Sequence, residues 1–364
     1  MEKIKVLVVD DSAFVRGILS KLLSGNGIEV IDTAKNGREG YEKALELKPD
    51  VITMDIEMPE MSGIEAVEKI TKEHPVPVIM ISSLTEEGAT ATLDALNAGA
   101  TDFIAKSASL TDMYTLKDEI TGKIKSLAGG SNLQNRIKRR TYLRKFESKG
   151  LELNEDEKKE ASSYRIEKSN IPGELKDIKI IGIGISTGGP GALQQIIPLL
   201  KSDLPVSIVI AQHMPKQFTY TLAERLNLMT QLTVKEAEDN EHLKPGHVYI
   251  APGGRQMRVT MRGKINISDI NPGHELYSPS VNILMDSIYH YARKKSLQII
   301  MTGMGNDGTK ALDNHRIHGG YILAQSPDTC VVAGMPNSVI DQGLADAVLP
   351  LREIPLFVNK IFEK

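Results

Sequence analysis

The chain has 364 residues, of which 41% are hydrophobic and 25% are charged. This is ordinary globular usage, so it excludes a wholly disordered, collagen-like or fibrous protein. At roughly 100–200 residues per domain, the length predicts two domains or one large barrel. The 44 basic and 47 acidic residues give a net charge of −3, which provides no global attraction to nucleic acid or to an anionic membrane.

The cysteine count and the hydropathy indicate the compartment. The single cysteine, Cys330, excludes a disulfide framework and a multi-cysteine zinc site, and it suits a reducing cytosol. No run approaches the ~20 apolar residues of a membrane span, and the start MEKIKVLVVDD does not resemble a signal peptide. We therefore expect a cytoplasmic protein without membrane insertion, in which Cys330 is an ordinary core residue.

Short apolar runs alternate with amphipathic stretches in the first hundred residues. The runs are KVLVV, VITM, PVIMI and DFIA (5–9, 51–54, 77–81 and 102–105), and stretches such as 12–24 and 38–47 have helical periodicity. Buried strands separated by helices are typical of a parallel α/β sheet. We expect the first domain, residues 1–124, to be a doubly wound parallel sheet.

Polar residues follow or end these runs. Asp10 and Asp11 come after the first run, Asp55 follows 51–54, Ser82 follows 77–81, and Lys106 ends the last. The carboxyl ends of parallel strands meet at one edge of a sheet, where ligands collect. Packed carboxylates repel one another unless a cation joins them, and oxygen ligands suit Mg²⁺. A carboxylate beside Mg²⁺, a hydroxyl and an ammonium is equipped to accept a phosphoryl group, whereas a lone aspartate would be a helix N-cap.

The order Asp-Asp, Asp, Ser, Lys, with the segment MPEMSG after the central aspartate, resembles the response-regulator receiver domain over roughly residues 3–120. The resemblance implies a flavodoxin-like fold with Asp55 as the phosphoacceptor. It also implies that Asp10, Asp11 and Asp55 hold Mg²⁺ together with the backbone of Glu57.

The same resemblance assigns three residues to the phosphorylation switch. It implies that Lys106 contacts the phosphoryl oxygens, that Ser82 is the hydroxyl that follows the phosphate, and that Phe103 is the switching aromatic. The family usually has proline after the lysine, commonly through a cis bond, whereas Ser107 stands here. A non-proline cis bond costs ~2.5–4 kcal/mol, so the geometry of this loop is left open.

The composition changes between about residues 125 and 175. Residues 136–145 hold six basic residues and no acid, and residues 152–160 hold five acidic residues and two lysines. Such charge blocks are typical of a solvated linker or an exposed helix. A docking segment for nucleic acid or protein is the less favoured alternative. We expect residues 125–175 to be a charged interdomain linker.

The alternation of apolar runs resumes at residue 178. Runs occupy 178–185, 205–211, 247–252, 296–303 and 320–325. They predict a second doubly wound parallel sheet, Rossmann-like, over residues 176–364.

A serine follows the first of these runs in a glycine-rich turn. Residues 184–188 read Gly-x-Ser-x-Gly between a predicted strand and a helix, which is the context of a nucleophile elbow. A dinucleotide fingerprint fails because Thr187 stands at the third glycine position, and a P-loop fails because no lysine lies between 181 and 200. Ser186 is therefore a candidate nucleophile, and a helix N-cap is the alternative reading.

A serine nucleophile needs a base and a group that orients the base. His213 closes the 205–211 run, and Asp307 follows the 296–303 run, so both are expected at the same sheet edge as Ser186. The order Ser–His–Asp differs from the Ser–Asp–His order of α/β-hydrolases. That alternative would pair Asp307 with His315 or His318, which fall within or just after the next predicted helix and are less favoured.

Six segments of the second domain, behind a receiver, resemble the chemotaxis protein-glutamate methylesterase family. They are GISTGGP, AQHMP, YIAPGG, SPSVNILMDS, MTGMGNDG and CVVAGMPNSVI, in the expected order. The resemblance implies Ser186 as nucleophile, His213 as general base and Asp307 as the residue that orients His213. The backbone N–H of Met304 would contribute to the oxyanion site.

The family resemblance also implies the reaction and the partners. The enzyme would hydrolyse glutamyl methyl esters on methyl-accepting chemoreceptors with release of methanol, and would also deamidate glutamines. A chemotaxis histidine kinase would phosphorylate the receiver, which covers the esterase cleft until phosphorylation, and the esterase domain would need no cofactor. The alternatives are a receiver-regulated esterase acting on small esters and a receiver-controlled nucleic-acid-binding module.

Two features around the YIAPGG segment concern binding. The family often has histidine where Gln256 stands, and no catalytic role is assigned to that position. Arg255 and Arg258 are candidates for docking an acidic receptor helix.

Overall fold

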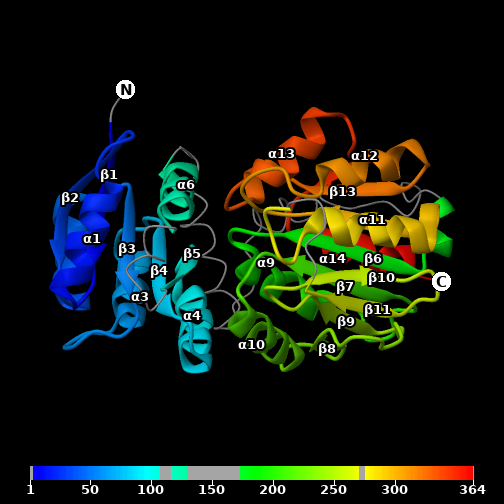
Figure 1. Ribbon diagram of the computed structural model, residues 1–364, viewed down its shortest axis with the longest axis horizontal. Coiled ribbons are helices and arrows are strands. Elements are labelled where there is room, and N and C mark those ends of the chain that lie inside the picture. The colour runs from blue at the N-terminus through cyan, green and yellow to red at the C-terminus, as the bar shows by residue number, and fades with distance from the viewer. Residues whose placement is uncertain (1–2, 107–115, 129–172, 270–274, 364) are drawn as a thin grey trace, which may run out of the picture. The chain divides into compact units, whose positions relative to one another are not determined.

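The structure, a computed structural model, describes residues 3–106, 116–128, 173–269 and 275–363. The chain divides into two compact units, residues 1–152 and 153–364. In Figure 1 the first unit runs from blue to cyan-green and the second from green to red. Ser107 and the charge blocks at 136–145 and 152–160 lie outside the described residues, so the expectations for them stay predictions.

The first unit is built on one five-stranded parallel sheet with the order β2-β1-β3-β4-β5 (Figure 1). Helix α1 packs beside α6, whereas α2, α3 and α4 pack in a row, so the two groups cover opposite faces of the sheet. The elements are β1 (Ile4–Val9), α1 (Ala13–Leu23), β2 (Ile28–Ala34), α2 (Gly37–Leu47), β3 (Val51–Asp55), α3 (Gly63–Glu73), β4 (Val78–Ser83), α4 (Glu86–Ala98), β5 (Asp102–Lys106) and α6 (Lys117–Ala128).

The burial of each strand explains whether it could be predicted from the sequence. Strand β3 is buried at every position and β4 at every position but its last, so both are continuous apolar runs. Strand β2 lies at the edge of the sheet, is half-buried over most of its length, and carries Glu29 and Asp32. It was not among the strands predicted from the sequence.

Side-chain caps begin four helices of the first unit. Ser12, Asn36, Ser62 and Thr85 each accept a hydrogen bond from a backbone N–H in the first turn of α1, α2, α3 and α4. These caps satisfy N–H groups that have no partner inside the helix, and each contributes about 0.5–2 kcal/mol. The chain therefore turns sharply after each strand, which keeps the strand ends together at one edge.

The second unit is built on a seven-stranded parallel sheet with the order β14-β13-β12-β6-β7-β9-β8. A two-stranded antiparallel hairpin, β10–β11, packs against α11. The elements are η2 (Gly173–Asp177), β6 (Ile180–Ile185), α9 (Gly189–Ile196), η3 (Ile197–Leu199), β7 (Ser207–Gln212), α10 (Lys216–Asn227), β8 (Thr233–Glu236), β9 (His247–Ile250), β10 (Gln256–Val259), β11 (Ile265–Ser268), α11 (Val281–Ala292), η4 (Arg293–Lys295), β12 (Ser296–Ile300), α12 (Thr309–Ile317), β13 (Tyr321–Gln325), η5 (Pro327–Thr329), α13 (Gly334–Asp341), β14 (Ala347–Leu349) and α14 (Glu353–Ile361).

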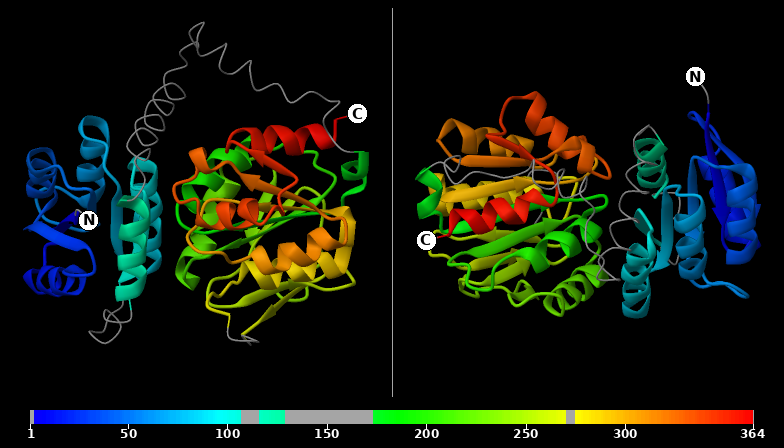
Figure 2. Two further views of the ribbon diagram at one scale, coloured as in Figure 1. Left: turned by 90° about the horizontal axis from the view of Figure 1, so that it is seen from above. Right: turned by 180° about the vertical axis from the view of Figure 1, so that it is seen from behind.

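Helices cover both faces of this sheet. Helix α11 packs beside α12 and α12 beside α13, while α9 packs beside α10. The C-terminal helix α14 joins the α9 face, because Asn359 accepts a hydrogen bond from Lys201 N at 2.9 Å and donates one to Leu199 O at 2.8 Å. Figure 2 shows red α14 and green α9 on one face, and yellow α11 and orange α12 on the other.

Both units are thus doubly wound parallel α/β sheets, and the predicted fold class is confirmed. Helix α6 continues to Ala128 and η2 begins at Gly173, so the domain limits at 124 and 176 stay predictions. Among the described residues, no helix is long and apolar enough to cross a membrane. Cys330 is buried, as predicted for a core residue.

Candidate functional site

Both sheets change winding direction at the first strand of their unit. In the first unit β1 lies between β2 and β3, and in the second β6 lies between β12 and β7. Ligands of open α/β sheets bind outside the carboxyl ends of the strands at such a switch point. Asp10 and Asp55 stand there in the first unit, and Ser186, His213 and Asp307 follow β6, β7 and β12 in the second.

Ser186 occupies a tight turn between β6 and α9. Its N–H donates to Thr302 O at 2.9 Å, and its carbonyl accepts from Gly189 N at 2.8 Å. Gly188 has φ 75°, and a Cβ added there would lie 2.5 Å from Val331, so only glycine fits this turn. Gly188 is also the N-cap of α9 and no side chain caps that helix. The N-cap reading of Ser186 is therefore wrong, and its hydroxyl is available for chemistry.

His213 joins Ser186 to Asp307 through its two ring nitrogens. Nδ1 lies 3.1 Å from Ser186 Oγ, and Nε2 lies 2.8 Å from Asp307 Oδ2. Both side chains of the His213–Asp307 pair are nearly inaccessible, at 9% and 4% exposure. A carboxylate only accepts hydrogen bonds, so the contact places the proton on Nε2 and leaves the Nδ1 lone pair for the serine hydroxyl.

Asp307 lies at the N-terminus of α11. Its Oδ2 accepts from Val281 N at 2.8 Å, and its Oδ1 accepts from Asn282 N at 2.9 Å and from Ser280 Oγ at 3.3 Å. Burial alone would raise the pKa of Asp307, but the bond from His213 and the two backbone N–H groups hold that pKa below its ordinary value. Asp307 is therefore an ionised, fixed partner for the imidazole.

The alternative pairing of Asp307 with a later histidine is not formed. His315 is fully buried against the edge of the Tyr289 ring, and burial lowers its pKa to about 4. His318 Nδ1 lies 2.7 Å from Asn314 O, one turn back in α12. His213 is the histidine that contacts Asp307.

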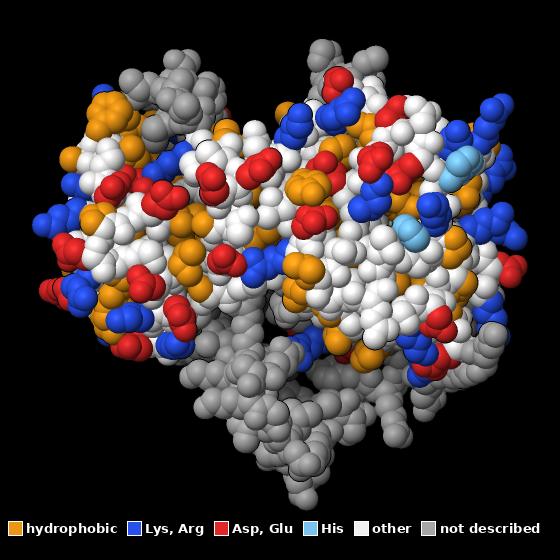
Figure 3. All heavy atoms as spheres, turned by 90° about the horizontal axis from the view of Figure 1, so that it is seen from below, with side chains coloured by type: hydrophobic (Ala, Val, Ile, Leu, Met, Phe, Trp, Pro, Cys, Tyr) orange, Lys and Arg blue, Asp and Glu red, His pale blue; other side chains and the backbone are white. Residues whose placement is uncertain are grey.

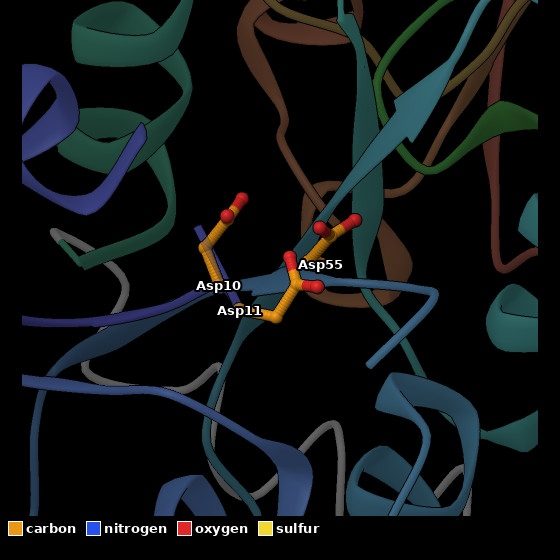
Figure 4. Close-up of side chains that lie close together, drawn as sticks. All are labelled: Asp10, Asp11 and Asp55. Atoms are coloured by element: carbon orange, nitrogen blue, oxygen red, sulfur yellow. The ribbon is translucent and has the colours of Figure 1, made fainter. Parts of the chain in front are cut away.

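The first unit holds a cluster of three carboxylates, Asp10, Asp11 and Asp55, drawn in Figure 4. Each offers an oxygen, and these oxygens lie within 4.8 Å of one another. Lys106 Nζ donates to Asp10 Oδ2 at 2.9 Å and to Asp55 Oδ2 at 2.6 Å. Burial raises the pKa of Asp55 to about 6, with the charge of Asp10 adding to the rise and Lys106 opposing it. This acidic, oxygen-only donor set is typical of a Mg²⁺ site.

The remaining predicted receiver residues are Ser82, Phe103 and Glu57. Ser82 is buried and donates to Gly88 O at 3.0 Å. Phe103 is buried in β5, with Lys123 Nζ 5.6 Å from its ring centroid. Glu57 is exposed two residues after Asp55.

Comparison with known proteins assigns the chain to a family. Residues 181–358 match the model of the CheB methylesterase, and residues 6–117 match that of the response regulator receiver domain. A protein-glutamate methylesterase/protein-glutamine glutaminase from Archaeoglobus fulgidus is 43% identical over 363 residues, which cover 99% of this chain and 98% of the relative. The chain belongs to this methylesterase/glutaminase family.

Three further similarities cover nearly the whole chain or one part of it. A methylesterase/glutaminase from Thermotoga maritima is 44% identical over 97% of this chain and 96% of its own length. The solved CheB methylesterase catalytic domain of Thermotoga maritima is 44% identical and covers 50% of this chain and 98% of its own, with a TM-score of 0.48. The solved response regulator domain of Thermotoga maritima CheB is 51% identical to this chain. It covers 36% of this chain and 99% of its own length, with a TM-score of 0.34.

The protein is therefore a receiver-regulated protein-glutamate methylesterase and protein-glutamine glutaminase of the CheB type, which acts in chemotaxis adaptation. The two alternative functions, a small-ester hydrolase and a nucleic-acid-binding module, are set aside. The predicted family, fold and reaction are confirmed.

The methylesterase site contains residues that the sequence did not single out for a role. The Tyr277 ring stacks on the His213 imidazole, with centroids 4.0 Å apart and planes at 13°. Buried Gln256 donates to Tyr277 O at 2.8 Å and to Ser278 Oγ at 3.0 Å, and it accepts from Ser280 N at 2.8 Å. The family departure at Gln256 and the family segment SPSVNILMDS, which begins directly after Tyr277, were the available signals for this loop.

The predicted oxyanion donor, Met304, follows Gly303, which lies against Ser186. A Cβ added at Gly303 would lie 2.8 Å from Ser186 Cβ and would overlap Met335 Sδ. Gly303 N donates to Val332 O at 2.8 Å, and Gly303 O accepts from Met335 N at 2.9 Å, which fixes the segment. The backbone that carries Met304 N–H is thus held beside Ser186.

Gly303→Ala is expected to lower methanol release about 10–100-fold, because the added methyl group pushes Ser186 and this segment apart. The change also costs packing around Met335, so the melting temperature should fall by a few degrees, on the order of 1 kcal/mol. Steady-state kinetics and thermal melts measure both effects. Gly17→Ala, where an added Cβ meets nothing within 4 Å, is the matched control. Normal activity in Gly303→Ala would contradict the prediction.

Of the two arginines predicted for docking, Arg255 is engaged within the domain. Its Nε donates to Asp269 Oδ1 at 2.6 Å, and the pair is exposed. Arg258 is half-buried in β10. On the face drawn in Figure 3, acidic and basic side chains are interspersed over the described parts of both units, which agrees with the near-neutral net charge. A docking role for either arginine stays a prediction.

Proposed function

We propose that Ser186, His213 and Asp307 carry out the hydrolysis, with the backbone N–H of Met304 as an oxyanion donor. The observation that carries this proposal is the pair of contacts made by one imidazole, 3.1 Å from the Ser186 hydroxyl and 2.8 Å from the Asp307 carboxylate. A nucleophile, a base and an orienting carboxylate in this arrangement are the requirements of acyl transfer through serine.

In the proposed reaction, His213 Nδ1 takes the proton of Ser186 while Oγ attacks the γ-carbonyl carbon of a glutamyl methyl ester. The carbon–methoxy bond then breaks, and His213 returns the proton to the leaving oxygen, so methanol departs. Next, His213 takes a proton from water, whose oxygen attacks the acyl carbon and displaces Ser186 Oγ. The serine recovers the proton and glutamate is left. With a glutamine side chain, the same steps release ammonia.

Asp307 stabilises the imidazolium that forms in both steps and keeps Nε2 protonated. The proposed N–H of Met304 would donate to the carbonyl oxygen as it becomes an oxyanion; such a donor is worth roughly 10²–10³-fold in rate. No cofactor takes part in these esterase steps.

In the receiver, we propose that Asp55 accepts the phosphoryl group. Its carboxylate oxygen attacks the phosphorus of a phosphohistidine, so a P–O bond forms as the P–N bond breaks. Asp10, Asp11 and Asp55, with the backbone of Glu57, would hold Mg²⁺, which when bound offsets the negative charge of the phosphoryl oxygens. The closely spaced carboxylates support this assignment.

The other receiver residues respond to that charge. Lys106, already within 2.6 Å of Asp55, would contact the phosphoryl oxygens. The Ser82 hydroxyl would leave Gly88 O to follow the phosphate, and Phe103 would act as the switching aromatic. Phosphorylation then changes the affinity of the receiver for the esterase domain, and this differential binding raises the esterase rate.

The proposed substrates are methyl-accepting chemoreceptors, and the proposed phosphodonor is a chemotaxis histidine kinase. The family names of the relatives support both, since glutamyl esters and glutamines are the groups named. The proposed domain limits are residues 1–124 and 176–364, with a linker over 125–175. The cytoplasmic location expected from the single cysteine stays a prediction.

Asp55→Asn is expected to abolish stimulation by a phosphodonor while leaving basal methanol release within about 2-fold, because the phosphoacceptor is removed from a unit that has no part in ester chemistry. The assay follows methanol release from methylated receptor membranes with and without acetyl phosphate and Mg²⁺. Asp50→Asn, an exposed aspartate of the same unit, is the control. Stimulation that persists in Asp55→Asn would overturn the phosphoacceptor assignment.

A further inference from the structure

We propose that Tyr277 is a positioning residue of the esterase site, whose aromatic ring holds the His213 imidazole in the plane that contains both Ser186 and Asp307. The inference rests on the proposed role of His213 as the base. Tyr277 contacts the base and not the reacting atoms, so it acts through His213.

The stacking geometry carries the proposal. The two rings are nearly parallel, at 13°, with centroids 4.0 Å apart. The two partner bonds of His213 leave from its ring edge, at Nδ1 and Nε2, and define only the line between Ser186 Oγ and Asp307 Oδ2. A flat ring against the face of the imidazole resists the tilt that those two bonds leave free.

The stack also bears on the proton transfer. His213 becomes positively charged when it takes the proton of Ser186, and the face of a tyrosine ring attracts a cation. The contact is therefore more favourable in the transition state than before it. An interaction of this kind raises kcat rather than lowering KM.

Hydrogen bonds from Gln256 and Gly254 hold the loop that carries Tyr277. Gln256, only 1% exposed, donates to Tyr277 O at 2.8 Å and accepts from Ser280 N at 2.8 Å. Gly254 N donates to Ser278 O at 2.9 Å. Ser280 in turn caps α11, whose first N–H groups bind Asp307. The same loop thus positions the Tyr277 ring, which stacks on His213, and the helix terminus that binds Asp307.

The hydroxyl end of Tyr277 lies near Gly305. A Cβ added at Gly305 would lie 3.7 Å from Tyr277 Oη, and Gly305 follows the proposed oxyanion donor Met304. The ring of Tyr277 thus lies on His213 while its hydroxyl lies near Gly305. The ring and the hydroxyl of Tyr277 therefore have different neighbours, and variants that remove one or the other can distinguish their roles.

The test compares Tyr277→Phe, which keeps the ring, with Tyr277→Leu, which removes it. For Tyr277→Leu we expect kcat for methanol release to fall about 10–100-fold with KM within about 2-fold, and labelling of Ser186 by a fluorophosphonate to slow in parallel. Tyr277→Phe is expected to retain both rates within about 3-fold. Tyr277→Met is the second non-aromatic variant if leucine lowers the melting temperature.

Tyr289→Leu is the matched control, because Tyr289 also lies against a histidine ring, that of His318 at 5.0 Å, but on the C-terminal turn of α11. Its kinetics should be unchanged. Normal kcat in both non-aromatic variants would overturn the proposal. If Tyr277→Phe loses as much kcat as Tyr277→Leu, the effect belongs to the hydroxyl and the proposal is overturned. If Tyr277→Leu raises KM and leaves kcat unchanged, the ring acts in substrate binding, which also overturns the proposal. Failure of the proposed function is separate, since it would show as activity retained in Ser186→Ala.

Discussion

Replacing Ser186 by alanine is expected to reduce kcat for methanol release by about 10⁴–10⁶-fold, which is the range for loss of a serine nucleophile. The physical reason is that no other hydroxyl contacts His213 Nδ1 among the described residues. The fold should be unaffected, because the turn is held by the backbone of Ser186, through Thr302 O and Gly189 N, and by Gly188. The measurement is methanol release, with a thermal melt beside it.

Ser202→Ala is the control for this variant. Ser202 is exposed in the loop before β7, on the edge of the sheet opposite to Ser186, His213 and Asp307. It should keep normal activity. If Ser186→Ala retains more than about a tenth of the normal kcat for methanol release, Ser186 is not the nucleophile. A loss of less than about 10-fold is too small for removal of the group that forms the covalent intermediate.

The three proposed catalytic positions were predictable because each follows a buried strand of a parallel sheet. Continuous apolar runs mark such strands, and the topology brings their carboxyl ends to one edge. That reasoning placed Ser186, His213 and Asp307 together. It also placed Asp10 and Asp55 together in the receiver, where the same rule applies to β1 and β3.

The supporting contacts were not predictable, because they come from loops packed across the edge. Tyr277 reaches His213 from a segment that ends no strand of the main sheet, and its ring position depends on the Gln256 side chain. The backbone N–H groups that bind Asp307 carry no side-chain signal at all. Edge strands were missed for a related reason: β2 and β14 are half-exposed, so their residues do not form a continuous apolar run.

Asp307→Asn is expected to lower kcat by about 10⁴-fold, as in serine triads whose orienting carboxylate becomes an amide. Asp307 Oδ2 accepts from Val281 N and His213 Nε2, and Oδ1 accepts from Asn282 N and Ser280 Oγ. An asparagine must place its NH₂ group at one of these two positions. At the first, it donates to His213 Nε2, so the proton moves to Nδ1 and that nitrogen no longer accepts the proton of Ser186. At the Oδ1 position, the NH₂ group faces the Asn282 N–H and the Ser280 hydroxyl, which are both donors.

Either orientation leaves a buried backbone N–H without an acceptor, so unfolding free energy should also fall by about 1–3 kcal/mol. The pKa of Asp307 is held below its ordinary value in the folded protein, so the stability it contributes is present above the unfolded pKa of about 3.9 and is lost as the pH falls through the lower folded pKa. The stability difference from Asp307→Asn should therefore shrink only in strong acid. Asp269→Asn, which breaks an exposed pair with Arg255, should change both rate and stability little. Near-normal activity in Asp307→Asn would mean that the stack and the Ser186 contact alone fix the imidazole, since no other described carboxylate contacts its Nε2.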